Sequence, residues 1–321
     1  LMNAKYRPLA ATIAVFVLLF GVGGALYNNF LSTLVLGDIL ADNAFVIIAA
    51  IGTTFVILSG GIDLSIGSMI GFVGVVIANL DAAGWHPLVS AGMMLVFGAL
   101  FGALVGFVID FCEIQPFIAT LAGLFLLRGA CFMINLDSTP IHHPFVTAFS
   151  EVSAPLPGGG SLQSSAMVML AALALGVVLA HFTSFGSDVY AIGGDRASAA
   201  LMGVPMRKRT VQIYALGGFY SALAGIVYAF YTSSGYPLAA TGAELGAIAA
   251  VVLGGTLLTG GVGLVAGTLF GGMILGLIAT LINFNGSLNG AWIMITSGAL
   301  LFFFIVLQRA LVGAISTRGA T

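Results

Sequence analysis

The sequence predicts an all-α integral membrane protein with about ten transmembrane helices, and two observations support this fold class. Of the 321 residues, 60% are hydrophobic and only 6% are charged, with a mean hydropathy of +1.16, whereas soluble domains carry about 25% charged residues. Apolar runs long enough to cross a bilayer recur, and the alternating pattern of a membrane β-barrel is absent. We therefore expect residues 1–321 to form a single transmembrane domain.

Ten expected spans of roughly 20 residues each account for most of the chain. Its 45 glycines indicate closely packed helices with glycine-rich breaks, which membranes tolerate where the freed backbone groups face protein or water. The expected spans cover residues 9–27, 38–58, 64–80, 88–109, 116–135, 165–183, 211–232, 243–258, 263–283 and 290–308.

The distribution of basic residues predicts the orientation, because cytoplasmic loops of membrane proteins are enriched in Lys and Arg. Eight of the nine basic residues fall in segments on one side of the ten-span arrangement, and Arg128, within the fifth span, is the exception. We expect both termini in the cytoplasm and a long extracytoplasmic loop over residues 136–164. The eight residues are Lys5, Arg7, Arg196, Arg207, Lys208, Arg209, Arg309 and Arg318.

Residues 187–210 form a charged, glycine-punctuated segment in an otherwise apolar chain. Asp195 is suited to N-cap a short helix over residues 196–202. Gly203 is placed to end that helix, and Pro205 blocks its continuation. The segment therefore predicts one short helix outside the bilayer.

One face of this short helix is expected to be apolar. Ala197, Ala200 and Leu201 share it at helical spacing, which forms a stripe suited to docking against another protein. A membrane protein that presents such a helix to the cytoplasm is expected to be driven by a soluble partner.

Two glycine-rich segments resemble each other: LSGGIDLSIGSMIG at 58–71 and LTGGVGLVAGTLFG at 258–271. Six of their fourteen positions are identical, and four of the six are glycines. Each segment lies where one expected span ends and the next begins. They are either related repeats, as is common in transporters, or glycine-rich hairpins that converged.

Three ionisable residues, Asp63, Arg128 and Glu244, lie within reach of the membrane interior. Charges there cost a few kcal/mol, so each is a functional candidate. The alternative is structural: Asp63 caps the helix that starts at Leu64, Arg128 pairs within the bundle and Glu244 sits at an interface. Asp63 is the strongest candidate, because a glycine break with polar neighbours can line a water-filled path.

Phe117 and Thr120 form a second candidate surface, three residues apart on one helix face. Pro116 before them is ordinary chemistry for the first turn of a helix. The pair would offer an aromatic ring and a hydroxyl to a polar solute such as a sugar, and ordinary packing explains it equally well.

Several protein classes have no support in the sequence. There is no G-x-x-x-x-G-K-[ST] loop, and the only lysines are Lys5 and Lys208, so the chain is not expected to hydrolyse ATP by that route. Hydrolase and metalloprotease motifs, paired catalytic carboxylates and a basic patch for nucleic acid are also absent. His142 and His143 are interpreted as loop residues rather than metal ligands.

Three passages carry a resemblance to a known family: TTFVILSGGIDLSIGS at 53–68, IQPFIATLAGLFLLRG at 114–129 and YAIGGDRASAALMGV at 190–204. The chain resembles the permease subunits of bacterial sugar ABC importers, the ribose-type branch of the branched-chain amino acid and sugar permease family. The resemblance extends over essentially the whole chain. The run STPIHHP is most similar to members that transport galactofuranose.

The resemblance implies a type II-like ABC importer permease fold in the bacterial inner membrane and a non-catalytic role. It implies a second permease, identical or similar, a cytoplasmic ATPase that binds ATP and Mg, and a periplasmic sugar-binding protein. Residues expected to couple to the ATPase are Gly194, Asp195, Arg196, Ala199, Ala200, Gly203 and Arg207. Residues expected along the sugar path are Ser59, Gly60, Gly61, Asp63, Ser65, Phe117, Thr120, Glu244 and Thr256.

A competing hypothesis is a proton-coupled secondary transporter of a small polar solute that uses Asp63, Glu244 or Arg128. Its uptake would need no nucleotide and would collapse with an uncoupler.

Overall fold

The computed structural model describes residues 7–318, which contain fourteen helices and four short strands. The helices are α1 (Arg7–Leu26), α2 (Thr33–Asp42), α3 (Ala44–Leu58), α4 (Ile66–Ala82), α5 (Pro87–Phe111), α6 (Pro116–Ile134), α7 (Pro144–Glu151), α8 (Ser164–His181), α9 (Ser184–Gly194), α10 (Arg196–Leu201), α11 (Met206–Thr232), α12 (Ala243–Leu253), α13 (Val265–Asn285) and α14 (Ala291–Arg318). The strands are β1 (Thr139–Pro140), β2 (Ser153–Pro155), β3 (Ser161–Gln163) and β4 (Ser234–Gly235).

Every expected span overlaps helical structure, but the count of ten spans is not confirmed. Within residues 7–318, six helices are long and apolar enough to cross a membrane, or seven if α2 and α3, bent by 58°, form one span. The apolar helices α4 and α12 are shorter, as is the segment 291–304 of α14. Glycine-rich breaks shorten α4 and α12, because α4 begins and α12 ends at such a break.

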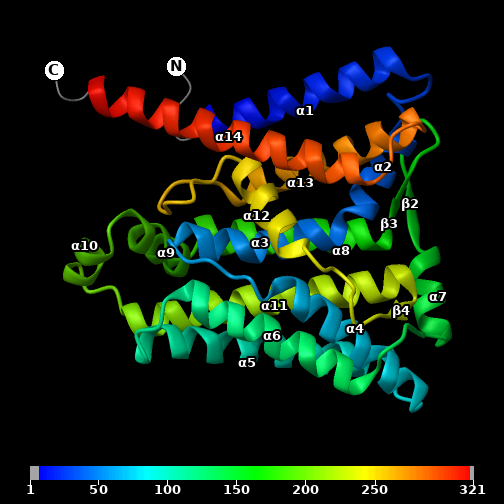
Figure 1. The fold of residues 1–321 in the computed structure, drawn as a ribbon, viewed down its shortest axis with the longest axis horizontal. Coiled ribbons are helices and arrows are strands. Elements are labelled where there is room, and N and C mark those ends of the chain that lie inside the picture. Colours follow the sequence, from blue (N-terminus) through cyan, green and yellow to red (C-terminus); the bar gives the residue numbers. More distant parts are fainter. Residues whose placement is uncertain (1–6, 319–321) are drawn as a thin grey trace.

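Helix α11 lies at the centre of the bundle and packs against α3, α4 and α5. Figure 1 shows the long helices running roughly side by side, with α1 and α14 along one edge and α5 and α6 along the other. Small residues allow the closest approaches: a Cβ on Gly98 of α5 would stand 2.6 Å from the carbonyl oxygen of Gly218 in α11. This is the close packing that the glycine content predicts.

The molecule has two distinct ends, which we call the α10 end and the α7 end. Figure 1 shows α9 and α10 at one end and α7 with the β2–β3 hairpin at the other. Helix α1 begins, and α14 ends, toward the α10 end. The basic residues in the first turn of α11, Arg207–Arg209, also lie at the α10 end, where Arg207 and Arg196 of α10 pair with the same Asp110. Lys5 is outside the described residues, as are the side chains of Arg7, Arg309 and Arg318.

The expected loop over residues 136–164 is more ordered than the sequence predicts. Strand β1 pairs with β4, which is distant in the sequence, whereas β2 and β3 pair with each other as a hairpin. Helix α7 lies between β1 and β2 in the chain. The imidazole Nδ1 of His143 accepts a hydrogen bond from the backbone N–H of Phe145 at 3.1 Å and so caps α7. In residues 7–318 no three His, Cys, Asp or Glu side chains gather as metal ligands.

Candidate functional site

Helix α10 forms where the sequence predicts it, and its ends are set by local signals. The Asp195 carboxylate accepts a hydrogen bond from the backbone N–H of Ser198 at 2.6 Å, which caps the helix. Hydrogen bonds from Ser198 hold the pKa of Asp195 below its usual range. The helix ends at Leu201, and Gly203 follows with a φ of +86°, a conformation that favours glycine.

The outer face of α10 is apolar and exposed, as predicted. Ala197 and Ala200 are exposed, and Leu201 is 90% exposed. Ala199 differs from the expectation that it contacts a partner, because it is completely buried against this chain. Ala199 thus anchors α10 to the bundle, while the alanines beside it face outward.

Ion pairs tie α10 and the start of α11 to neighbouring helices. Asp110, at the end of α5, pairs with Arg196 at 2.8 Å and with Arg207 at 3.8 Å, although its side chain is only 6% exposed. Arg209 pairs with Asp188 of α9 at 2.6 Å. Neither acid was expected to take part: the only signals were that Asp110 directly follows the expected span 88–109 and that Asp188 lies in the charged segment 187–210.

Three glycine-rich segments meet at the end of α9, one residue before α10 begins. The N–H of Gly261 donates to the carbonyl oxygen of Leu58 at 2.8 Å. A Cβ on Gly193 would collide with that same oxygen, and a Cβ on Gly260 would stand 2.9 Å from the nitrogen of Gly60. Only glycine allows the three backbones to approach this closely. We call residues 58–61, 193–194 and 260–261 the glycine junction.

The first break, between α3 and α4, satisfies its own polar groups. Asp63 is 5% exposed, and its Oδ1 accepts hydrogen bonds from the N–H and the hydroxyl of Ser65 at 2.8 and 2.7 Å. Helix α4 begins at Ile66, two residues after the expected Leu64. The Tyr214 hydroxyl donates to the carbonyl of Ile62 at 3.3 Å. The Asp63 side chain therefore shapes the break.

The second break, between α12 and α13, contains a buried hydroxyl. Thr256 is completely buried, and its Oγ1 has no hydrogen-bond partner among the described residues. A Cβ on Gly263 would collide with this oxygen. The Tyr190 hydroxyl of α9 donates to the carbonyl of Gly263 at 2.9 Å. Each break is thus held by a tyrosine from another helix.

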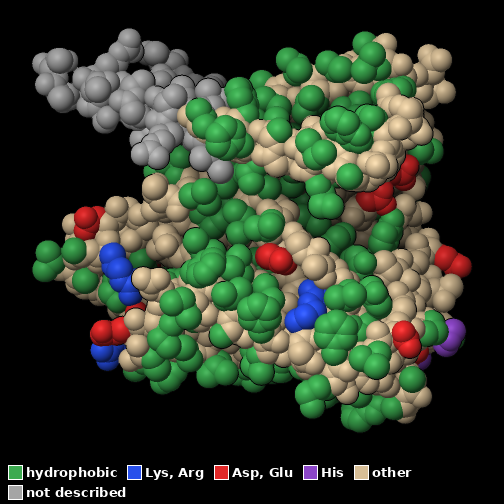
Figure 2. All heavy atoms as spheres, viewed as in Figure 1, with side chains coloured by type: hydrophobic (Ala, Val, Ile, Leu, Met, Phe, Trp, Pro, Cys, Tyr) green, Lys and Arg blue, Asp and Glu red, His purple; other side chains and the backbone are tan. Residues whose placement is uncertain are grey.

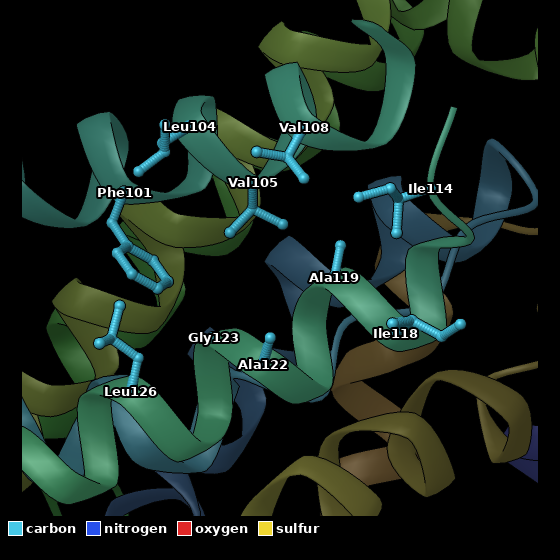
Figure 3. Close-up of a pocket in the computed structure, with 10 residues that line it drawn as sticks. All are labelled: Phe101, Leu104, Val105, Val108, Ile114, Ile118, Ala119, Ala122, Gly123 and Leu126. Carbon is cyan, nitrogen blue, oxygen red and sulfur yellow. The ribbon is translucent and has the colours of Figure 1, made fainter. Parts of the chain in front are cut away.

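Phe117 and Thr120 do not form a shared surface. Thr120 is completely buried and its hydroxyl donates to the carbonyl of Pro116 at 2.9 Å, whereas Phe117 is 50% exposed. Figure 3 shows a groove between α5 and α6 lined by ten residues, all of them apolar or glycine. This groove offers no hydrogen-bonding side chain to a sugar.

Arg128 and Glu244 lie near each other on a different face. The Arg128 Nη1 donates to the carbonyl oxygens of Pro237 and Ala239, at 2.5 and 3.0 Å. The Glu244 Oε2 is buried without a hydrogen-bond partner in the part of the chain that the structure describes. Figure 2 shows an acidic and a basic side chain close together in the middle of a largely apolar face.

The fold and these features define an integral membrane protein of the transport-permease class. The family model for the permease component of branched-chain amino acid transport systems matches residues 35–305. The chain belongs to this permease family. No solved structure matches it.

Three similar proteins are permeases of sugar or ABC transport systems by name. The chain is 51% identical to the inner membrane ABC transporter permease protein YjfF of Escherichia coli K12, over 97% of this chain and 94% of that protein. It is 35% identical to the fructose import permease protein FruG of Bifidobacterium longum, over 96% and 92%. It is 36% identical to the ribose import permease protein RbsC of E. coli K12, over 86% of each chain.

Proposed function

We propose that this chain is the transmembrane permease subunit of an ATP-driven sugar importer in the bacterial inner membrane. One observation carries the proposal: α10 presents an exposed apolar face and directly follows α9, whose last residues, Gly193 and Gly194, lie in the glycine junction that joins both helix breaks. A displacement of α10 would therefore be transmitted through the junction to α3, α4, α12 and α13 together. Relatives named as ribose and fructose import permeases support the cargo class.

The coupling mechanism follows from how α10 is attached. Arg196 connects α10 to α5 through Asp110, so a docked ATPase would move both elements as one unit. The backbones at the junction are tightly packed, and packed interfaces switch between discrete arrangements rather than deform continuously. We therefore expect α10 to move together with the helices that meet at the junction. Alternating access to a central path would result. Gly194, Asp195, Ala200, Gly203 and Arg207 complete the proposed coupling surface.

This function requires partners and an orientation. The α10 end would face the cytoplasm with both termini, since Arg196, Arg207, Lys208 and Arg209 lie there. A cytoplasmic ATPase would bind ATP and Mg, and a periplasmic binding protein would deliver sugar to the α7 end. A second permease, identical or similar, would complete the path.

The proposed cargo is a monosaccharide, and galactofuranose is the specific candidate. That choice rests on the resemblance of the STPIHHP run to galactofuranose permeases. The proposed path runs past the first break with Ser59, Gly60, Gly61, Asp63 and Ser65, then past Thr256 and Glu244. The exposed ring of Phe117 would contribute to the path. Thr120 would not contact the sugar, because its buried hydroxyl bonds to the carbonyl of Pro116 within α6.

A substitution on α10 tests the coupling role. Replacing the exposed Ala200 with Asp should abolish sugar uptake while membrane insertion stays normal, because a charge would disrupt the apolar docking face. The matched control is Ala83→Asp, an exposed alanine at the α7 end, which should transport normally. Normal uptake by Ala200→Asp would refute the coupling assignment.

An energy-source experiment tests the transporter class. Vesicles that contain the permease, its ATPase and its binding protein should take up labelled galactofuranose in the presence of an uncoupler and stop when ATP is removed. Unlabelled ribose, fructose and xylose, added in excess, measure the cargo preference. Uptake that follows an ion gradient without nucleotide would instead establish the secondary transporter.

A further inference from the structure

Two oppositely charged side chains lie against one face of α4. A Cβ on Gly67 would collide with the Oε2 of Glu244, and a Cβ on Gly71 would stand 2.8 Å from the Nη1 of Arg128. The two glycines are one helical turn apart, about 6 Å along the axis. Glu244 comes from the first turn of α12 and Arg128 from α6. Only glycine at positions 67 and 71 leaves space for both charged groups.

Arg128 and Glu244 do not neutralise each other directly. Among the described residues, no ion pair within 4.0 Å joins them. The hydrogen bonds of Arg128 within the described chain all come from Nη1, which leaves Nε and Nη2 to donate elsewhere. The buried Oε2 of Glu244 accepts no hydrogen bond there. Each group therefore retains unused hydrogen-bonding capacity.

The surroundings of the pair indicate that it does not face lipid. Arg128 lies well inside α6, a helix long enough to cross the membrane. Charged groups turned toward hydrocarbon are strongly unfavourable, so charges within spans line water-filled cavities or contact polar partners. Both residues are half-buried rather than fully enclosed. The face between α4, α6 and the start of α12 is therefore expected to meet water or a polar solute.

We infer that Arg128 and Glu244 form a binding site for a neutral, hydroxyl-bearing solute. A guanidinium only donates hydrogen bonds and a carboxylate only accepts them, whereas each sugar hydroxyl does both. Adjacent hydroxyls of one sugar would accept from Arg128 and donate to Glu244. Because the two charges balance, the site favours a neutral ligand over an ion. This inference rests on the proposed sugar-import function and specifies where that sugar is held.

Arg128 also positions the acid. Its Nη1 holds the carbonyls of Pro237 and Ala239, in the segment that leads to Glu244. A shift of α12 relative to α6 would separate the two charged groups and weaken the site. Such a site would bind sugar in one access state and release it in the other, as transport requires.

Uptake and ATP hydrolysis, measured on the same reconstituted complex, test this site. Glu244→Gln and Arg128→Gln should each lower uptake of labelled galactofuranose at least tenfold. ATP hydrolysis stimulated by the loaded binding protein should stay within twofold of wild type, because α10 and the glycine junction are intact. The matched control, Glu113→Gln, neutralises an exposed acid outside the helices and should leave both rates unchanged.

A second variant separates sugar contact from a structural role. Glu244→Asp keeps the charge but withdraws the carboxylate by one methylene, so the uptake ratio of galactofuranose to ribose should change at least threefold. Equal losses for both sugars, or failure of Glu244→Gln to assemble with the ATPase, would overturn the inference in favour of a structural role. Wild-type uptake by Glu244→Gln and Arg128→Gln would overturn it as well. If the wild-type complex takes up no sugar, the proposed function itself fails.

Discussion

The two glycine-rich breaks, residues 58–71 and 258–271, share four glycines at the same spacing and differ in their surroundings. In the second break, a Cβ on Gly267 would collide with the carbonyl of Gly254, and one on Gly271 with that of Ala250, so α13 packs backbone to backbone on α12. The equivalent glycines of the first break, at 67 and 71, instead admit the charged ends of Glu244 and Arg128. The same glycine spacing therefore permits close backbone packing of α12 on α13 in the second break and the approach of two charged side chains in the first.

The breaks also differ where the chain turns. Asp63 and Ser65 form a hydrogen-bonded turn in the first break. Gly263 and Val265 occupy the equivalent positions of the second, where Gly263 leaves space for the buried Thr256. Glycine spacing determines where another group can come close, and the neighbouring helices determine which group does. Close packing thus explains the similarity of the two segments without establishing common ancestry.

The largest effect is expected where the two breaks meet at the end of α9. Gly193→Ala would drive a methyl group into the carbonyl of Leu58. Overpacking against rigid backbone costs about 3 kcal/mol, so uptake should be lost and the unfolding temperature should fall. For thermal stability alone, the adjacent Gly194→Ala is the control, because a Cβ there meets nothing within 4 Å. Equal thermal stability of the two variants would show that the junction is not tightly packed.

The two glycine pairs can be compared by the same substitution. Gly271→Ala would meet the backbone of α12 and should cost about 2 kcal/mol of stability. Gly71→Ala would meet the Arg128 side chain, 2.8 Å from Nη1, which can move partly away. We expect Gly71→Ala to destabilise the protein less than Gly271→Ala does. We also expect Gly71→Ala to reduce sugar uptake more. A thermal melt and an uptake assay on both variants make the comparison, and the reverse ranking would contradict it.

The acid of the first break should have an intermediate effect. Asp63→Ala removes the acceptor for both hydrogen bonds from Ser65 in a buried turn, which should cost about 1–2 kcal/mol. Asp63→Asn retains an acceptor oxygen and should lose less. Unfolding followed by tryptophan fluorescence measures the difference. If the alanine variant is as stable as wild type, the turn does not depend on this carboxylate.

The smallest effect concerns the cap of α10. The lowered pKa of Asp195 means that the ionised carboxylate stabilises the folded helix. This contribution is fully present above the unfolded aspartate pKa of about 3.9 and disappears as pH falls through the lower folded value. Amide exchange at Ser198, corrected for its intrinsic pH dependence, should therefore lose protection below about pH 3.9. Asp195→Asn should lack this pH dependence, and identical profiles for both proteins would exclude the carboxylate as the cause.

Features that depend on neighbouring residues in the chain could be predicted well. The N-cap at Asp195 and the end of α10 before Gly203 are confirmed, and every expected span overlaps helical structure, although the count of ten spans is not confirmed. The apolar face of α10 at Ala197, Ala200 and Leu201 is also confirmed as exposed. Capping, turn chemistry and hydrophobic run length act over a few residues, so a single sequence contains them.

Features that join distant residues could not be predicted. Asp110 and Arg196 are 86 positions apart, and the junction joins residues near 58, 193 and 260. The burial of Ala199 and the ordering of residues 136–164 depend on similar long-range contacts.

The sequence by itself determined that this is a helical membrane protein with a short capped helix outside its apolar segments, because composition, run length and capping are local properties. Only the tertiary structure decided that both glycine breaks meet at the end of α9 and that the Glu244 Oε2, near Arg128, has no hydrogen-bond partner among the described residues. The physical reason is that a glycine permits close approach without specifying a partner. The partner is chosen by the packing of helices that are far apart in the chain.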